Sequence, residues 1–374
     1  MNILHVVNIY FVLPYFIGDQ FKYFKEKGYN MNVVCSRSEY LASYAKEQGF
    51  DYIESPVNRS ISLKDDFVTI WKICRFIKKK KIDIVVGHTP KGGLLAMISA
   101  WIMRVPNRIY FRHGLVYETS QGLKRFILMS VDRLTSLCAT KIVCVSPSLL
   151  KKSIEDKLAP AKKQVILGHG TCGGIDTINK FNPEKVDLQK VSDLRKRLGI
   201  NIQDYIIGYS GRLVRDKGIV DLINAFDLLD NSENCKLLFV GMFEDRDALP
   251  ETVRTRIEND PRIIYTGFVN GGMEYYYALM DVYILPSYRE GFGMGLLEAQ
   301  AMERPVLTTK VTGCCDAIVE GETGLFVSHD PQDIANKINS IRFRHLIDGR
   351  NGRKWVMKYF DNRIIWNEIE KLYQ

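Results

Sequence analysis

The chain has 374 residues, of which 46% are hydrophobic and 25% are charged. This length exceeds a single ordinary hydrophobic core and predicts two domains of normal size. The net charge of +9 is uneven, because residues 1–180 hold 27 basic and 14 acidic side chains while the remainder holds 25 and 29. The basic half indicates a face for an anionic partner, with a phospholipid surface, a nucleic acid and a phosphorylated substrate as candidates.

Cysteines and apolar stretches argue against a secreted or membrane-spanning protein. The eight cysteines form no C-x-x-C motif, which is typical of a reducing compartment and gives no zinc-site spacing. The first apolar stretch lacks the flanks of a signal peptide and predicts a strand. Residues 94–103 are apolar but end at Arg104, which is too short to cross a bilayer. We expect a cytoplasmic protein, soluble or peripheral to the membrane.

Strands and helices alternate through the first half of the chain. This alternation predicts a parallel sheet with helices on both faces. A glycine-rich stretch and a polar stretch then reach residue 190 or so, and we place the domain boundary there, between residues 1–190 and 191–374. The expected strands cover residues 3–7, 31–35, 83–87, 108–112, 141–145 and 165–167, and the expected helices cover 16–27, 41–48, 66–81, 93–103 and 122–139.

The same alternation restarts in the second half. The chain is therefore predicted to be an α/β protein with two tandem Rossmann-like, doubly wound domains and an interdomain cleft, where the carboxyl ends of the strands bind ligands. A last segment, 355–373, has helical spacing of apolar residues and is expected to pack back on the N-terminal domain. The expected strands cover residues 205–208, 236–240, 263–266, 282–285 and 305–308, and the expected helices cover 218–229, 251–259, 273–280 and 295–302.

The most specific segment runs from residue 285 to residue 302, LPSYREGFGMGLLEAQAM. A buried strand leads into a turn with three glycines and then into a helix. Such glycines let backbone amides approach a ligand, and a helix N-terminus favours an anion such as a diphosphate. Glu290 and Glu298 stand on either side of this turn, where carboxylates can accept hydrogen bonds from sugar hydroxyls. Taken alone, the two acidic residues would equally suit a helix N-terminus that complements its dipole.

A second segment, GYSGRLVRDKG at residues 208–218, follows the first strand of the second domain. Arg212 and Lys217 can neutralise a diphosphate, with Arg as a planar fork and Lys as a point charge. Two fixed cations can stabilise the charge that grows on a leaving diphosphate without a metal. By itself this segment would read as an exposed basic loop.

Together the two segments resemble the family 4 glycosyltransferases of the GT-B fold, which carry an Arg-x4-Lys pair and a Glu-x7-Glu pair. The resemblance implies that Arg212 and Lys217 hold the donor diphosphate, that Glu290 contacts the donor sugar and that Glu298 binds the ribose. It also implies that the turn and the loop after the strand at 263–266 meet the nucleotide. The residues placed there are Gly293, Met294, Gly295 and Leu296 beside the donor, and Phe268 and Val269 beside the base.

In such enzymes the first domain binds the acceptor. His113 ends a strand and is a candidate to contact the donor sugar or assist the reaction, although a lone histidine is often structural. His88 and Lys91, after another strand, are candidates to meet an acceptor phosphate or sugar. Many relatives have a glycine-rich turn after the first strand, whereas here the only glycine of that stretch is Gly18, so a phosphate contact there is not expected.

Two further features concern metals and membranes. Asp245 and Asp247 spell the D-x-D signature of another glycosyltransferase fold, but they stand in a polar loop, so we predict no metal and no other cofactor. Seven aromatics between residues 10 and 24, interleaved with lysines, suit an interfacial segment on an anionic leaflet, with a core helix as the alternative. No nucleic-acid motif is present, so no nucleic-acid partner is expected.

The sequence thus predicts a metal-independent, retaining hexosyl- or N-acetylhexosaminyltransferase. The resemblance implies that the donor would be a nucleotide sugar, by default a UDP-sugar, and the acceptor a polyprenyl-diphosphate-linked saccharide at the inner face of a bacterial membrane, in capsule or O-antigen assembly. Two alternatives stay open: a nucleotide-sugar 2-epimerase of the same architecture, which would need no acceptor, and a non-catalytic nucleotide-sugar-binding subunit.

Overall fold

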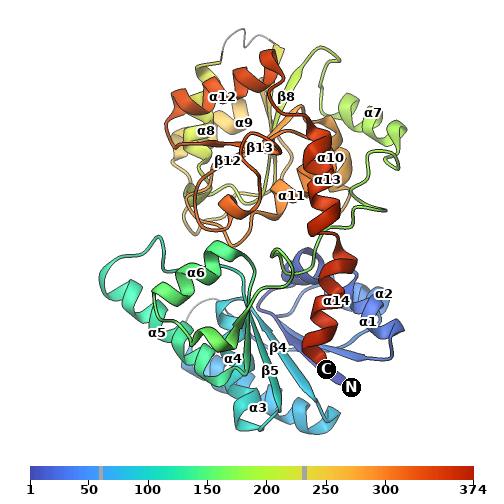
Figure 1. Cartoon of the computed structure of the whole chain (residues 1–374), viewed down its shortest axis with the longest axis vertical. Helices are drawn as coiled ribbons and strands as arrows, with labels where there is room; N and C mark the ends of the chain where they lie inside the picture. Colours follow the sequence, from blue (N-terminus) through green and yellow to red (C-terminus); the bar gives the residue numbers. More distant parts are fainter. Residues whose placement is uncertain (59–61, 230–233) are drawn as a thin grey trace. The chain divides into compact units, whose positions relative to one another are not determined.

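The computed structural model describes residues 1–58, 62–229 and 234–374 (Figure 1). The chain divides into two compact units, residues 1–174 together with 363–374, and residues 175–362. Each unit is built on one parallel sheet with helices packed against it. The predicted fold class, two tandem α/β domains, is confirmed.

The sheet of the first unit has the order β3-β2-β1-β4-β5-β6-β7, and all its pairs are parallel. Its central strands are buried over most of their length, as expected for strands that are covered on both faces, whereas the edge strand β3 is partly exposed. The order reverses beside β1, which lies between β2 and β4. The strands are β1 (Asn2–Val6), β2 (Asn30–Cys35), β3 (Asp51–Glu54), β4 (Ile84–His88), β5 (Asn107–Arg112), β6 (Lys141–Cys144) and β7 (Gln164–Val165).

The helices of the first unit begin at recognisable caps. The Ser62 side chain accepts the amide of Asp65 at the start of α3, and Ser146 accepts the amide of Leu149 at the start of α6. Figure 1 shows α3, α4 and α5 side by side, with α1, α2 and α14 on the other side of the strands. The helices are α1 (Gln20–Glu26), α2 (Leu41–Gln48), α3 (Leu63–Lys80), α4 (Pro90–Ile102), α5 (Gly122–Cys138), α6 (Pro147–Glu155) and α14 (Asn362–Tyr373), with a π-turn at Leu13–Ile17 and a 3-10 turn at Ala161–Lys163.

The second unit repeats the plan with the order β10-β9-β8-β11-β12-β13, and its order reverses between β8 and β11. The strands are β8 (Tyr205–Ser210), β9 (Cys235–Val240), β10 (Ile263–Tyr265), β11 (Val282–Leu285), β12 (Val306–Thr309) and β13 (Gly324–Val327). The helices are α7 (Leu188–Arg197), α8 (Ile219–Asp227), α9 (Glu251–Asn259), α10 (Met273–Leu279), α11 (Met294–Ala301), α12 (Pro331–Arg344) and α13 (Gly349–Tyr359), with 3-10 turns at Arg215–Lys217 and Cys314–Asp316.

The division between the units falls at Gly174, earlier than the boundary expected near residue 190. The residues that follow are bonded to the end of the second unit: Ile175 donates its amide to the carbonyl of Phe360 over 2.8 Å, and Arg353 donates to the carbonyl of Phe181 over 3.0 Å. The glycine-rich stretch marked the connection, but these long-range bonds place the polar stretch after it in the second unit.

The C-terminal segment, expected as one helix over 355–373, is two helices separated at Phe360 and Asp361. The second of them, α14, belongs to the first unit from residue 363 onward. There Asn367 accepts a hydrogen bond from the Tyr23 hydroxyl over 2.9 Å, and the Tyr23 ring lies 4.9 Å from that of Trp366.

The aromatic segment of residues 10–24 is not one interfacial surface. Phe21 and Phe24 on α1 are fully buried, and only Phe11 and Tyr15 are counted among the exposed large apolar residues. The helical period of α1 turns these two phenylalanines toward the sheet, so the core alternative holds for them. No helix within the described ranges is both long and apolar enough to cross a bilayer.

Candidate active site

The residues of the two motifs lie at the carboxyl end of the second sheet, beside the point where its strand order reverses. Arg212 and Lys217 follow β8, and Glu290 follows β11, which is the neighbour of β8. Glu298 lies on α11, the helix that comes after the same turn. Two adjacent strands therefore bring both motifs to one edge, which is where open α/β sheets bind ligands.

The loops after β8 and β11 are bonded to each other. Tyr288 donates its amide to the carbonyl of Asp216 over 2.9 Å, and the Arg289 guanidinium meets the Asp216 carboxylate at 2.7 Å. Lys217 donates in return to the carbonyl of Arg289 over 3.1 Å. These contacts join two loops that are more than seventy residues apart in sequence.

Gly218 explains how closely these loops approach. Its φ is +69°, and a Cβ at this position would lie 2.0 Å from the carbonyl oxygen of Pro286. Glycine alone among the amino acids adopts this backbone conformation readily and needs no space for a Cβ. The glycine after Lys217 is thus required to hold the lysine against the β11 loop.

Lys217 and Glu290 form the central ion pair of the site. The Lys217 Nζ lies 2.5 Å from Glu290 Oε1, and both side chains are largely buried. The Ser287 hydroxyl donates to the same oxygen over 3.3 Å. A buried cation whose carboxylate partner comes from the neighbouring loop can exchange that partner for a phosphate oxygen of a ligand.

Arg212 is the more open of the two cations. Its Nη1 lies 2.6 Å from Glu244 Oε2, and its side chain is 40% exposed. Burial acts to lower the pKa of Arg212, but the hydrogen bond to Glu244 and the charges of Glu244, Asp216 and Glu290 raise it overall. Arg212 is therefore a permanent cation within reach of the charge of Glu290.

Glu298 is held by hydroxyl groups that sequence reasoning missed. The Tyr277 hydroxyl donates to Glu298 Oε2 over 2.7 Å, and Tyr277 in turn bonds Ser210 at the end of β8. Burial raises the pKa of the Glu298 carboxyl. The run of three tyrosines at 275–277 offered no signal, because its spacing does not show which ring faces the motif.

The start of α11 lies tightly against the strands. A Cβ on Gly295 would lie 2.2 Å from the Tyr283 hydroxyl oxygen, and the φ of Gly293 is +74°. The amide of Leu296 already donates to the carbonyl of Gly293 over 2.9 Å. Of the four residues predicted beside the donor, Leu296 thus uses its amide in a hydrogen bond within the helix. The amides of Met294 and Gly295 come before it, at the N-terminus of the helix.

The predicted base-lining loop follows β10, at the same edge of the sheet. Gly241, after β9, donates its amide to the carbonyl of Gly267 over 3.1 Å, which ties this loop to the loop after β9. Leu213, in the loop of Arg212, donates its amide to the carbonyl of Met242 in the same β9 loop over 2.9 Å. Phe268 is half exposed. An exposed aromatic ring beside the motif residues is suited to stack against a flat base.

The D-x-D sequence has a local structural role. Asp247 accepts the amide of Asp216 through its carboxylate over 2.8 Å, and its carbonyl accepts the amide of Arg215 over 3.0 Å. Asp247 therefore braces the loop that carries Lys217. Within the described ranges, no cluster of three or more histidine, cysteine or acidic side chains is arranged to hold a metal.

In the first unit, His88 and His113 come together at the carboxyl ends of β4 and β5. His88 Nδ1 lies 3.0 Å from His113 Nε2, and His88 Nε2 lies 3.0 Å from Nδ1 of His5 on β1. Both ring nitrogens of His88 are thus occupied, and its side chain is buried. Lys91 pairs with Asp66 at 2.5 Å. Sequence reasoning did not single out His5, because it sits inside a strand.

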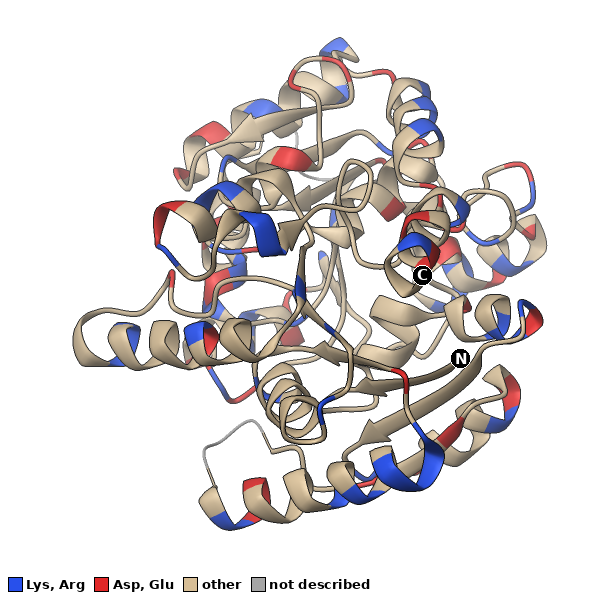
Figure 2. Cartoon of the chain, turned by 60° about the horizontal axis from the view of Figure 1, so that its bottom comes forward, with Lys and Arg blue, Asp and Glu red and all other residues tan. Residues whose placement is uncertain are grey.

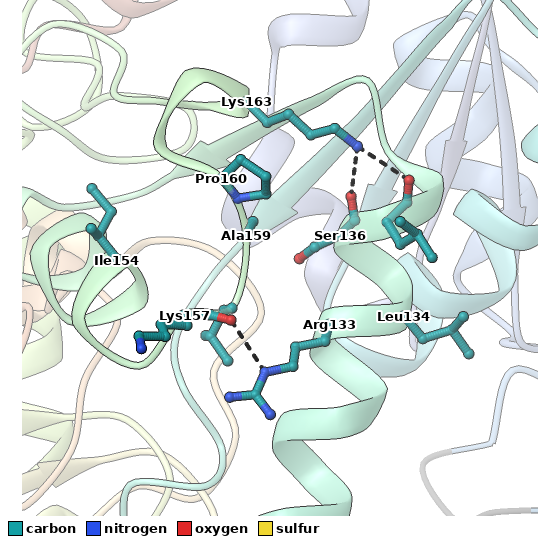
Figure 3. Close-up of a pocket in the computed structure, with 10 residues that line it drawn as sticks. Arg133, Leu134, Ser136, Ile154, Lys157, Ala159, Pro160 and Lys163 are labelled. Atoms are coloured by element: carbon teal, nitrogen blue, oxygen red, sulfur yellow. Dashed lines mark hydrogen bonds between the residues drawn. The ribbon is translucent and has the colours of Figure 1, made fainter.

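A hollow of about 710 Å³ lies elsewhere in the first unit, between α5 and the segment after α6 (Figure 3). Lys163 donates to the carbonyls of Ser136 and Leu137 at the end of α5, and Arg133 donates to the carbonyl of Lys157. Arg133 and Lys163 are thus engaged with backbone, and none of the motif residues lines the hollow.

Comparisons with known proteins identify the family of the chain. A model described as glycosyl transferase 4-like matches residues 3–146, and one described as glycosyl transferases group 1 matches residues 204–342. The capsular polysaccharide biosynthesis glycosyltransferase CapM of Staphylococcus aureus is 36% identical over 378 aligned positions, which cover 100% of this chain and 96% of CapM. The chain belongs to the family 4 glycosyltransferases, and it is a glycosyltransferase.

Two further relatives bear on the fold and the reaction. An Escherichia coli protein named UDP-Gal:alpha-D-GlcNAc-diphosphoundecaprenol alpha-1,3-galactosyltransferase is 24% identical over 86% of this chain and 81% of its own length. The crystal structure of Anabaena HepE in complex with UDP and glucose superposes with a TM-score of 0.82 at 19% identity, covering 99% of this chain and 98% of HepE. The latter likeness shows the GT-B fold. The curated relatives described here are transferases, which does not favour the epimerase alternative.

Proposed function

We propose that this chain is a retaining, metal-independent glycosyltransferase of bacterial surface polysaccharide assembly. It transfers a hexosyl or N-acetylhexosaminyl group from a UDP-sugar to a polyprenyl-diphosphate-linked saccharide, at the inner face of the cytoplasmic membrane. One observation supports this proposal above all others: Arg212, Lys217 and Glu290 converge where the strand order of the second sheet reverses, with Lys217 and Glu290 in contact.

The donor diphosphate is bound by cations and by the start of α11. Lys217 exchanges the carboxylate of Glu290 for a phosphate oxygen, and Arg212 supplies the second cation. As the bond to the sugar breaks, negative charge grows on the diphosphate, and two preorganised cations stabilise it. Glu290, released from Lys217, then accepts hydrogen bonds from the sugar, while Glu298 accepts them from the ribose.

Transfer proceeds with retention, by attack of the acceptor hydroxyl from the face that the diphosphate leaves. The two motif carboxylates support this route over a double displacement. Glu290 is assigned to the hydroxyls of the donor sugar, and Glu298 accepts a hydrogen bond from Tyr277. Neither carboxylate is set up as an unencumbered nucleophile.

The acceptor proposal rests on the first unit and on the relatives. CapM is named for capsular polysaccharide biosynthesis, and the Escherichia coli relative is named for a diphosphoundecaprenol-linked acceptor. An acceptor of this kind has an anionic diphosphate and a saccharide. The excess of basic residues in the first half of the chain complements the diphosphate.

We place the membrane-facing surface on α3, the end of α4 and α5, and not on the segment of residues 10–24. One stripe of α5 exposes apolar side chains at helical spacing. Lys64, Lys72 and Arg75 stand next to or near the exposed apolar residues of α3 in sequence, and Figure 2 marks the lysine and arginine positions along the ribbon. Exposed apolar groups with surrounding cations fit an anionic leaflet. The exposed large apolar residues of this surface are Leu63, Phe67, Val68, Trp71, Trp101, Ile102, Leu123, Phe126, Ile127, Leu134 and Leu137.

A transfer assay tests the enzymatic proposal. The protein is incubated with a panel of UDP- and GDP-sugars and polyprenyl-diphosphate-linked saccharides, with and without a chelator, and released nucleoside diphosphate and glycolipid product are measured. We expect product only when donor and acceptor are both present, with the same rate in chelator and with the donor's anomeric configuration kept. Conversion of the donor alone into an epimer would reject the proposal, and so would binding of UDP without turnover.

Sedimentation with lipid vesicles tests the membrane surface. The double variant Phe126→Asp/Leu137→Asp is compared with Ile202→Asp/Leu346→Asp, which changes exposed apolar residues of the second unit by the same charge. We expect the wild type and the control to bind vesicles containing phosphatidylglycerol, and the α5 variant to lose most of that binding. Equal binding of all three proteins would remove α5 from the membrane surface.

A further inference from the structure

The three histidines of the first unit form an uninterrupted chain across three neighbouring strands. His5 comes from β1, His88 from the end of β4 and His113 from the residue after β5, and β1, β4 and β5 are adjacent in the sheet. Each of the two nitrogen-to-nitrogen distances is 3.0 Å. The rings of His5 and His88 are inclined by only 14°, so their nitrogens meet edge to edge.

Aromatic side chains enclose this chain. Phe16 stacks on His113 with ring centroids 4.4 Å apart, Phe111 stacks on His88 at 5.0 Å, and Phe21 meets His5 edge-on at 5.4 Å. These rings restrict rotation of the imidazoles. His5 and His88 are buried, whereas His113 keeps part of its surface exposed. Burial accordingly lowers the pKa values of His5 and His113 to about 3 and that of His88 well below its usual value. The three histidines are therefore uncharged at neutral pH.

The contacts couple the proton positions of the three rings. A neutral imidazole has one N–H and one bare nitrogen, and each contact joins an Nδ1 atom to an Nε2 atom of the next ring. Exactly one proton must lie in each contact for it to be a hydrogen bond. If His88 carries its proton on Nδ1, then His5 and His113 must carry theirs on Nδ1 as well, and the same holds for Nε2. The three rings share one tautomer.

We propose that His5 and His88 are positioning residues that lock His113 into a single neutral tautomer. The remaining nitrogen of His113, Nδ1, then has a fixed hydrogen-bonding character toward a sugar hydroxyl, as donor or as acceptor. This inference rests on the proposed function, in which the carboxyl edge of the first sheet meets a saccharide. It reassigns His88 from a contact with the acceptor to a residue that acts through His113.

The row of three histidines acts as a clamp, in the sense that it fixes the tautomer of His113, and it is not a route for proton transfer. At its inner end, Nε2 of His5 is buried and meets no hydrogen-bonding group in the described part of the chain. A proton that entered at His113 would have to charge a buried ring, which burial opposes. The arrangement resembles the way a second group fixes the tautomer of a histidine that binds a ligand.

Nuclear magnetic resonance of the ¹⁵N-labelled imidazoles tests the clamp without any assay of activity. The chain of 374 residues has six histidines, and the signals are assigned with single variants. At pH 7 we expect the three chain histidines to be neutral and to carry their protons on the same-named nitrogen. In His88→Leu, which keeps an apolar side chain but no hydrogen bond, the His113 signals are expected to average between tautomers. In His88→Gln, whose amide offers a donor beside an acceptor, one tautomer should persist.

Sugar transfer by the same variants adds a second readout. We expect His88→Leu to lower kcat/KM by about tenfold, in line with the loss of one well-placed hydrogen bond, and His88→Gln to restore most of it. His345→Asn, at an exposed position of the second unit, is the control for assignment and activity. Mixed tautomers in the wild type, or an unchanged His113 signal in a folded His88→Leu, would overturn the clamp. Absence of transfer by a wild type with uniform tautomers would instead reject the proposed function alone.

Discussion

The carboxyl edges of the two sheets share a topology and differ in their chemistry. In the second unit the edge holds charges: Arg212, Lys217 and Glu290 lie together and pair with carboxylates or with each other. In the first unit the corresponding edge holds uncharged imidazoles enclosed by phenylalanine rings. A charged edge suits a ligand whose charge changes during reaction, whereas a neutral edge suits a ligand that must be oriented. The doubly wound sheet supplies the position and the side chains supply the function.

The largest effect is expected at the charged edge, from Glu290→Ala. Removal of this carboxylate takes away the proposed sugar contact and leaves Lys217 unpaired, so we expect kcat/KM to fall by about 100-fold or more, as for a preorganised active-site group. Circular dichroism should be unchanged. The control is Glu258→Ala, which removes an exposed carboxylate paired with Arg254 on α9. Near-normal turnover of a folded Glu290→Ala would take Glu290 out of the site.

The free energy of unfolding should depend on pH through the buried histidines of the neutral edge. The pKa values of His5 and His113 are about 3 when folded and near 6.5 when unfolded. Between these values the unfolded chain binds protons that the folded chain does not, so the free energy of unfolding falls as the pH drops from 6.5 toward 3, by about 1.4 kcal/mol per pH unit for each histidine. Urea titrations at several pH values measure this slope.

The comparison variant for this slope is His5→Leu/His88→Leu. It removes two of the titrating groups, so its stability should change less steeply with pH over the same interval. If the free energy of unfolding changed equally steeply with pH in the wild type and the variant, the histidines would take up protons in the folded protein. That result would contradict the proposal that the three histidines stay neutral.

Gly218→Ala tests whether the two loops of the charged edge must touch. A Cβ there would lie 2.0 Å from the Pro286 carbonyl, whereas a Cβ on Gly321, with a similar positive φ of +78°, meets nothing within 4 Å. Gly321→Ala should therefore cost about 1–2 kcal/mol of unfolding free energy from backbone strain alone. We expect Gly218→Ala to cost more than that and also to weaken UDP binding. Equal losses in thermal or urea unfolding would show that the loops can separate freely.

The smallest effect concerns the orientation of Glu298. Tyr277→Phe removes the hydroxyl that donates to this carboxylate, and we expect the KM for the donor to rise by about tenfold with little change in kcat, since a hydrogen bond to a charged group is worth about 1.5–3 kcal/mol. The neighbouring Tyr276→Phe is the matched control. A changed kcat at constant KM would indicate that Tyr277 acts on the reacting atoms and not on ribose binding.

Much of the fold followed from local pattern. The apolar run before Gly87 and the run before Gly208 predicted buried strands, and glycines at helix ends marked several boundaries. The strands Asp51–Glu54 and Gly324–Val327 and the helices Pro147–Glu155, Leu188–Arg197 and Pro331–Arg344 were missed, because they are short or largely polar and gain stability from packing. Of the candidate site, the four motif residues were predictable from their position around a strand, a glycine turn and a helix, while Tyr277, Ser210 and His5 were not.

The sequence by itself determined the alternation of strands and helices, the family and the four charged residues of the motifs, because these depend on residue type and short-range spacing. Only the tertiary structure decided which groups meet: Lys217 with Glu290, Tyr277 with Glu298, and the three histidines with one another. Such contacts join residues 21 to 83 positions apart. The order of strands in a sheet brings them together, and that order is set by packing of the whole unit and not by any local run of residues.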